Sequence, residues 1–120
     1  MKVSGKPLNN VARITTGKVG RDLTLEQGRR SAELTRLCML ATIKSAVGEL
    51  SRVKQVLQIT GMVNATDDFT DHPGVINGFS DLFVIAFGEA GKGARAAVGM
   101  ASLPSNIAVE IQAIVERHDE

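Results

Sequence analysis

The sequence predicts an α+β fold with a single mixed β-sheet and two helices packed on one face of it. Two segments repeat apolar residues at the helical period, and several others have the extended or alternating pattern of strands. The expected order is strand, strand, helix, strand, helix, strand, strand. With both helices on one side of the sheet, the other face has no cover from its own chain.

Length and composition indicate a single domain over residues 1–120, because 43% hydrophobic residues are enough for one core. No apolar run approaches the roughly 20 residues of a membrane helix, and the start does not resemble a signal peptide. We therefore expect a cytoplasmic protein without a membrane partner. Fourteen Lys and Arg against thirteen Asp and Glu, with four Phe and no Trp or Tyr, disfavour nucleic acid as a partner.

The beginning of the chain predicts two short strands. The stretch "KVSGKPLNNVARITTGKVG" has extended character around Val3 and around Ile14, with Gly, Pro and Asn between them. This pattern resembles a hairpin.

The first helix is predicted over about 25–47. Thr24 and Gln27 can form a capping box, in which each side chain accepts from the other residue's backbone N–H, and Gly48 can end the helix in the left-handed conformation. Its apolar stripe is expected to comprise Leu34, Leu37, Cys38, Leu40, Ala41, Ile43 and Val47.

The stretch "RVKQVLQITGMVNAT" changes to the strand period. Its apolar face is expected to hold Val53, Leu57, Ile59 and Val63. A second helix is then predicted from Pro73 to the glycines of "GEAGKG". The polar residues before it, Asp67, Asp68, Asp71 and His72, are read as helix-capping groups rather than metal ligands, because no second histidine is near.

The last two strands are predicted to form a hairpin closed near Leu103 and Pro104. By alternation, the residues expected to face the helices are Ala94, Ala96, Val98, Met100, Val109, Ile111, Ala113 and Val115. The opposite face is expected to hold Arg95, Ala97, Gly99, Glu110, Gln112 and Ile114. This mixture of small residues and a few polar heads suits contact with another copy of the chain.

Arg95 and Glu110 are charges within otherwise apolar strands, and both are candidate site residues. An arginine with small neighbours can hold a carboxylate through two parallel hydrogen bonds; the alternative is a surface or inter-subunit salt bridge. The expected hairpin would place Arg95 opposite about residue 113, so Glu110 would lie about 10 Å along the ladder. A direct pair is disfavoured, and space for a small ligand remains.

Two further polar residues have open interpretations. Asn77, in the first turns of the second helix, either is solvated or reaches a neighbouring site, and Ser4 of "VSG" can be a turn hydroxyl. A serine hydrolase is not indicated, because neither histidine lies in a recognisable nucleophile context.

Taken in order, "VSG", "TGKVGRD", "DF", "GARAAVG", "LPSN" and "VEIQAI" resemble the RidA/YjgF family of imine and enamine deaminases, also described as L-PSP endoribonucleases or translation inhibitors. The resemblance covers nearly the whole chain. It implies a chorismate-mutase-like fold and a homotrimer with a ligand pocket at each subunit interface.

The same resemblance implies roles for four residues. Arg95 corresponds to the arginine that grips the carboxylate of a 2-imino or 2-enamino acid, and Glu110 to the acid that positions the attacking water. Ser4 corresponds to the serine of the "SG" turn, and Asn77 to an asparagine of the second helix. The implied reaction is hydrolysis to a 2-keto acid and ammonia, with no cofactor and no metal.

The chain also departs from the family pattern. It opens almost directly at "VSG", so we expect the domain to lack the family's usual N-terminal strand, and no tyrosine is present. Ala97 stands where well-known members have cysteine, and Lys6 where they have glutamine. The alternative function is therefore a non-catalytic binder of small carboxylates, or an interaction protein, on the same fold. A ribonuclease has no electrostatic or aromatic support in the sequence.

Overall fold

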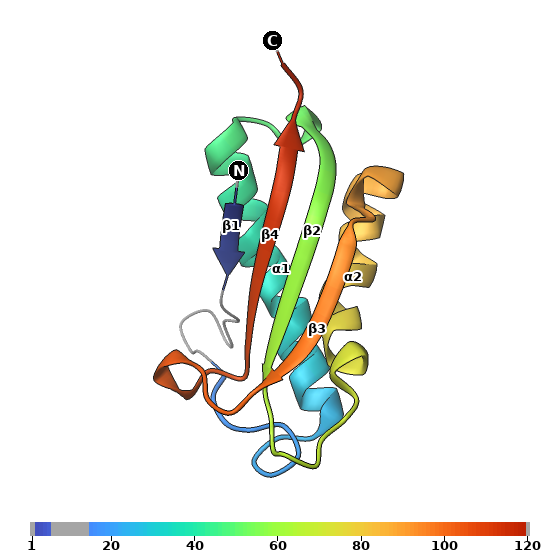
Figure 1. The fold of residues 1–120 in the computed structure, drawn as a ribbon. Coiled ribbons are helices and arrows are strands. Elements are labelled where there is room, and N and C mark those ends of the chain that lie inside the picture. Colours follow the sequence, from blue (N-terminus) through green and yellow to red (C-terminus); the bar gives the residue numbers. More distant parts are fainter. Residues whose placement is uncertain (1, 6–14, 120) are drawn as a thin grey trace.

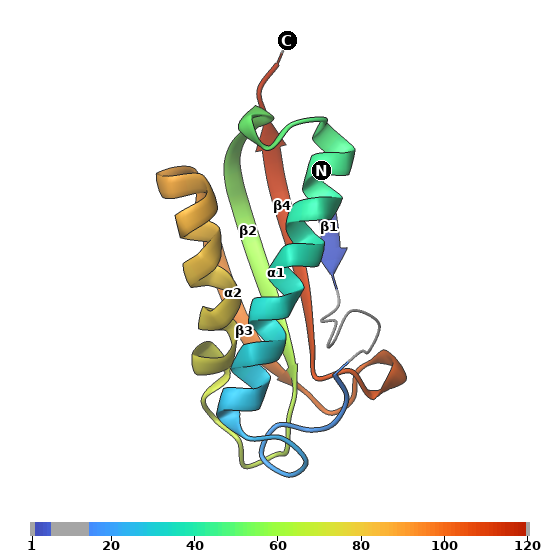
Figure 2. The same cartoon turned by 180° about the vertical axis from the view of Figure 1, so that it is seen from behind.

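The computed structural model describes residues 2–5 and 15–119 and confirms the predicted fold class. Two helices, α1 (Leu25–Val47) and α2 (His72–Phe87), cover one face of a four-stranded sheet. Figures 1 and 2 show this two-layer arrangement from the open face and from the helical face. The strands are β1 (Lys2–Gly5), β2 (Val53–Asn64), β3 (Ala94–Met100) and β4 (Val109–Arg117).

The sheet order is β1-β4-β2-β3, with β4 antiparallel to both neighbours and β3 parallel to β2. The predicted strand around Val3 is thus confirmed, and its partner in the described chain is β4. The predicted strand around Ile14 lies outside the described residues. Nearby, Thr16 forms an isolated bridge to Ile107.

The predicted hairpin of the last two strands is wrong. β2 lies between β3 and β4, so the connection through the short 3-10 turn Pro104–Asn106 crosses from the β3 edge to the far side of β2. The reason is α2, which joins β2 to β3 as a crossover and returns the chain parallel to β2. Turn residues at 103 and 104 signal a change of direction but not which strand comes next to which.

Helix α1 has the predicted bounds and caps. The Thr24 hydroxyl accepts from the Gln27 N–H at 3.2 Å, the Gln27 side chain accepts from the Thr24 N–H at 2.8 Å, and Gly48 has φ +96°. The predicted apolar stripe is displaced, because Leu37 is 56% exposed and Ala41 is exposed. The buried residues are Gly28, Ser31, Ala32, Thr35, Met39, Ile43 and Val47. Packing on the sheet selects small residues where the helix lies close, and Leu37 faces away.

The apolar face of β2 also differs from the prediction at one position. Register shifts between Val53 and Gln55 and between Val56 and Gln58 interrupt the alternation. Val56 is fully buried as a result, and Leu57 is 47% exposed on the open face. Ile59 and Val63 are buried, as predicted.

The core lies between the sheet and the two helices. Helix α2 contributes the largest buried side chains, Phe79 and Phe83, whose rings lie 4.4 Å apart. Below them β4 presents the residues predicted to face the helices: Val109, Ile111, Ala113 and Val115 are all buried. At Gly61 of β2, an added Cβ would lie 2.6 Å from Ile76, so α2 packs directly on the strand backbone.

A buried asparagine connects two of the quoted motifs. The Asn64 amide donates to the side chain of Asn106, the last residue of "LPSN", at 3.0 Å and to the carbonyl of the next residue, Ile107, at 3.1 Å. On its other side, Lys18 of "TGKVGRD" donates to the Asn64 side-chain oxygen at 2.9 Å and to the Ala101 carbonyl. These motifs therefore hold three loops together at one end of the sheet.

The Asp22 carboxylate of this loop accepts from Arg21 and from the Lys18 backbone N–H at 2.9 Å, and these hydrogen bonds lower its pKa from 3.8 to about 2. A lowered folded pKa contributes stability above pH 4, and this contribution is lost as the pH falls toward 2. In an NMR titration, Asp22 should titrate near pH 2 and move upward in Arg21→Gln. An ordinary pKa for Asp22 in the unmodified protein would contradict the loop geometry.

Within the described residues, neither helix is long and apolar enough to cross a membrane.

Candidate functional site

Arg95 lies on β3, at the edge of the sheet, and faces α2. Arg95 is paired with Ile59 of β2, which in turn is paired with Ala113 of β4, so the three side chains lie on the same face of the sheet. Ile59 and Ala113 are both buried under the helices. Gly99 of the same strand also faces α2, because an added Cβ would meet the His72 imidazole. The predicted orientation of β3 is therefore wrong: Arg95, Ala97 and Gly99 face the helix, and Ala94, Ala96, Val98 and Met100 lie on the open face.

The Arg95 guanidinium is held by neutral groups of α2. Its Nη1 donates to the Asn77 side-chain oxygen at 2.6 Å and to the Ser80 hydroxyl at 3.3 Å. Asn77 and Ser80 are three positions apart, so they project from the same side of the helix. No salt bridge among the described residues includes Arg95. Its positive charge is oriented by neutral groups, and no carboxylate of the described chain neutralises it, which suits it to bind an anion.

A pocket of about 300 Å³ opens beside this guanidinium. It is lined by Ile59, Asn77, Ser80, Val84, Gly91, Lys92, Gly93 and Arg95. Two glycines bring its wall close to the core, since a Cβ at Gly91 would clash with the Phe83 carbonyl and one at Gly93 with the Val56 carbonyl. The pocket thus combines an apolar floor, two hydrogen-bonding side chains and two cations, a composition that suits a small anionic ligand.

Of the four predicted site residues, only Asn77 and Arg95 come together in one chain. Glu110 is on the open face, as predicted, opposite Met62 and one row removed from buried Val109 and Ile111. Glu110 is two strands away from Arg95 across the sheet and three residues away along β4 from Ala113, which lies level with Arg95. Ordinary sheet spacing makes the distance between the Cα atoms of Glu110 and Arg95 about 14 Å. The sheet itself separates the two residues, so no pocket formed by the described residues of a single chain contains both.

Ser4 is equally distant from Arg95. It belongs to β1, the opposite edge strand of the sheet, where its backbone is paired with Gln112. The residues that sequence reasoning missed are Ser80 and Lys92. The i, i+3 spacing from Asn77 could have indicated Ser80; nothing in the local pattern indicates that Lys92 lines the same pocket.

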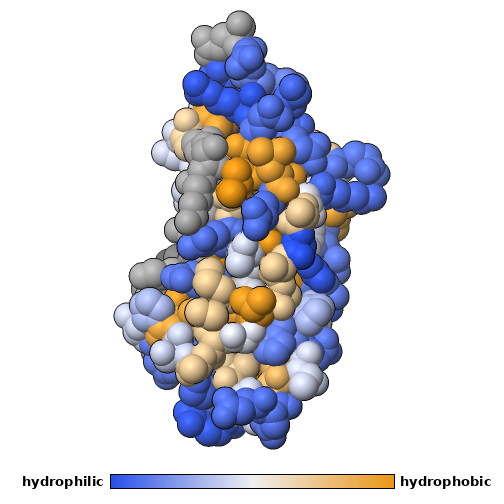
Figure 3. Space-filling model, in the orientation of Figure 1, coloured by the Kyte–Doolittle hydropathy of each residue, from blue (hydrophilic) through white to orange (hydrophobic). Residues whose placement is uncertain are grey.

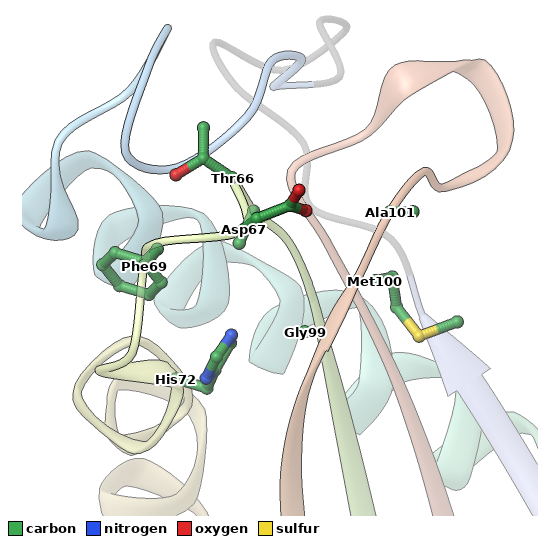
Figure 4. Close-up of a pocket in the computed structure, with 8 residues that line it drawn as sticks. Thr66, Asp67, Phe69, His72, Gly99, Met100 and Ala101 are labelled. Carbon is green, nitrogen blue, oxygen red and sulfur yellow. The ribbon is translucent and has the colours of Figure 1, made fainter.

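A second pocket, of about 270 Å³, lies at the other end of β3. Figure 4 shows its lining residues from the β2–α2 loop, the start of α2 and the end of β3. The His72 imidazole packs edge-on against Phe69, with ring centroids 5.3 Å apart, and against Gly99. Asp71 accepts from the Gly74 N–H at 3.0 Å, which agrees with the predicted capping role. Among the described residues, no group of three His, Cys, Asp or Glu side chains is arranged to hold a metal ion.

The open face of the sheet carries exposed apolar side chains. Figure 3 shows apolar surface over β2, β3 and β4 on this side of the molecule. Leu57 and Val98 are 47% and 41% exposed there. Glu110 and Gln112 lie half-buried on the same face.

The arrangement of one mixed sheet with two helices on one face is the chorismate-mutase-like fold. A family model described as "YjgF/chorismate_mutase-like, putative endoribonuclease" matches residues 2–116. The chain belongs to this family.

Three relatives illustrate the match. Protein TCP17 of Trypanosoma cruzi is 42% identical over 118 residues, which are 97% of this chain and 74% of TCP17. The solved structure of Atu1372, a protein of unknown function from Agrobacterium tumefaciens, is 45% identical with a TM-score of 0.91, over 97% of this chain and 75% of that one. A structure from Shewanella oneidensis with the same endoribonuclease description is 32% identical with a TM-score of 0.89, over 96% of this chain and 77% of that one.

Proposed function

We propose that the protein hydrolyses reactive 2-imino and 2-enamino acids to 2-keto acids and ammonia, at a pocket between subunits of a homotrimer in the cytoplasm. The observation that carries the proposal is the Arg95 guanidinium, which lines a pocket of about 300 Å³ and whose hydrogen-bond partners among the described residues are the neutral side chains of Asn77 and Ser80. A substrate carboxylate is the natural counter-charge for such a group.

For this reaction the protein mainly has to hold the substrate and the attacking water in position. The oxygen of water bonds to the imine carbon, and both protons of that water pass to the nitrogen. The C–N bond then breaks as the C=O bond forms, so nitrogen leaves as ammonia with no net oxidation or reduction. Arg95 and Asn77 would orient the substrate, and Glu110 would hold the water and accept its proton. The substrate is already electrophilic, so these residues need supply only orientation and charge.

The separation of the proposed residues supports a pocket shared by neighbouring copies. Glu110 lies on the open face, and Ser4 lies on β1 at the opposite edge of the sheet from Arg95. One chain cannot bring them to Arg95, whereas a second copy that places its open face beside the β3 edge can. The exposed apolar side chains of that face, including Leu57 and Val98, favour such burial.

The experiment is ammonia release from an imine made in place by a PLP-dependent dehydratase acting on threonine. The purified protein should accelerate the appearance of 2-oxobutyrate and ammonia above the spontaneous rate. Binding of 2-oxobutyrate in calorimetry without any acceleration would instead support the non-catalytic carboxylate binder. Degradation of RNA that follows the protein peak and disappears in Arg95→Ala would favour a nuclease.

A further inference from the structure

We propose that Lys92 makes this pocket selective for substrates with a second carboxylate, namely 2-imino dicarboxylates of four or five carbons. This inference rests on the proposed function for the chemistry of the substrate. It goes further in assigning the substrate class and the residue that selects it.

Two residues with cationic side chains line the same small pocket. Lys92 and Arg95 both line it, and they stand three residues apart where the chain enters β3. Lys92 precedes the first residue of β3, so strand alternation does not fix the side on which its side chain lies, and three residues of chain hold the two Cα atoms no more than about 11 Å apart. The carboxyl carbons of a four- or five-carbon diacid are about 4 to 5 Å apart. The long, flexible Lys92 side chain can turn from Glu89 toward the free end of a ligand whose other carboxylate is held at Arg95.

The backbone of Lys92 is fixed, and its side chain is available. Its N–H donates to the Glu89 carbonyl at 3.1 Å, and its carbonyl accepts from the Gln55 side chain at 3.0 Å. The Nζ is paired with the Glu89 carboxylate at 2.9 Å, but the two side chains are 56% and 88% exposed. An exposed pair of this kind is weak, so a ligand carboxylate held at Arg95 can take its place.

The rest of the pocket favours a short ligand over a long apolar one. Ile59 and Val84 supply apolar contact for the methylene carbons, while Gly91 and Gly93 pack against the backbone of α2 and β2. The volume of about 300 Å³ is at the small end of ligand pockets. An apolar substituent that reached Lys92 would leave the ammonium next to hydrocarbon, whereas a carboxylate there gains a charge-assisted hydrogen bond.

The test compares two stable keto acids with the same number of carbons, so that catalysis is not needed. Calorimetry should show that 2-oxoglutarate binds about 10-fold more tightly than 2-oxopentanoate, the size of effect expected from one hydrogen bond to a charged group. In Lys92→Gln the preference should fall below about 3-fold, and in Lys92→Arg it should remain.

Lys54→Gln is the matched control. Lys54 has the same 56% side-chain exposure and also pairs with a glutamate, Glu116, at 4.0 Å, but it does not line the pocket. This variant should keep the full preference. Equal affinity for the two keto acids, a preference unchanged in Lys92→Gln, or no binding of either ligand would overturn the inference.

The outcomes also separate this inference from the proposed function. If the preference depends on Lys92 and no imine is deaminated, the dicarboxylate site stands and the enzymatic proposal fails. If imines are deaminated without a Lys92-dependent preference, the enzymatic proposal stands and the selectivity fails.

Discussion

Replacing Arg95 by alanine should lower kcat/KM for imine hydrolysis at least about 100-fold, since each lost hydrogen bond to a charged group is worth about 1.5–3 kcal/mol. The guanidinium has no carboxylate partner among the described salt bridges, so its removal should leave the fold and the assembly unchanged. Ammonia release measures the first effect and light scattering the second. Arg117→Ala, at an exposed strand arginine outside the pocket, is the control and should keep full activity.

Mixed assemblies test whether neighbouring copies share the site. Arg95→Ala and Glu110→Gln should each be inactive alone. When they are unfolded and refolded together, about a quarter of the sites in random oligomers should combine an intact Arg95 with an intact Glu110 from another copy. Recovery near this level supports the shared pocket. If mass measurements show mixed oligomers but no activity returns, the shared pocket is contradicted. Either both residues would then act within one chain, or one of them would take no part in the reaction.

Phe79→Ala should lower the free energy of unfolding by about 3–5 kcal/mol, the usual cost of emptying a core site of this size. Phe79 is fully buried, and its ring stacks at 4.4 Å on Phe83. It also lies between Asn77 and Ser80 in α2, so the same cavity should loosen the helix that orients Arg95. Urea denaturation at one fixed protein concentration measures the loss.

Ile85→Ala is the control on the same helix. Ile85 is 77% exposed, and its truncation should change stability by no more than about 0.5 kcal/mol in the isolated chain. A Phe79→Ala loss below about 1 kcal/mol would mean that α2 is not held by the packing described for it.

Local chemistry accounts for the parts of the structure that sequence reasoning predicted well. The bounds of α1 follow from Thr24, Gln27 and Gly48, whose hydrogen bonds and left-handed φ involve only their neighbours in the chain. The face of β4 follows in the same way, because Val109 and Ile111 contrast clearly with Glu110 between them. Asn77 and Arg95 stand out in the sequence as polar residues in apolar segments, and the structure places them together.

β3 shows why orientation could not be predicted. Both of its faces carry small or modest apolar residues, so alternation gives no contrast between them. The choice depends on α2, which lies so close to the strand that Gly99 must face His72 while Val98 takes the open side. Helix α1 is a second case. Its hydrophobicity pattern predicts that Leu37 is buried, whereas smaller residues fit against the sheet and Leu37 is exposed.

The sequence by itself therefore determined the element types, the capped ends of α1 and the chemical identity of the candidate site residues, because these depend on contacts within a few residues. The tertiary structure alone decided that β2 separates β3 from β4, that Arg95 faces α2, and that Lys92 shares its pocket. Those features arise from packing between segments far apart in the chain, where the closeness of two backbones rather than the polarity of one residue selects the arrangement.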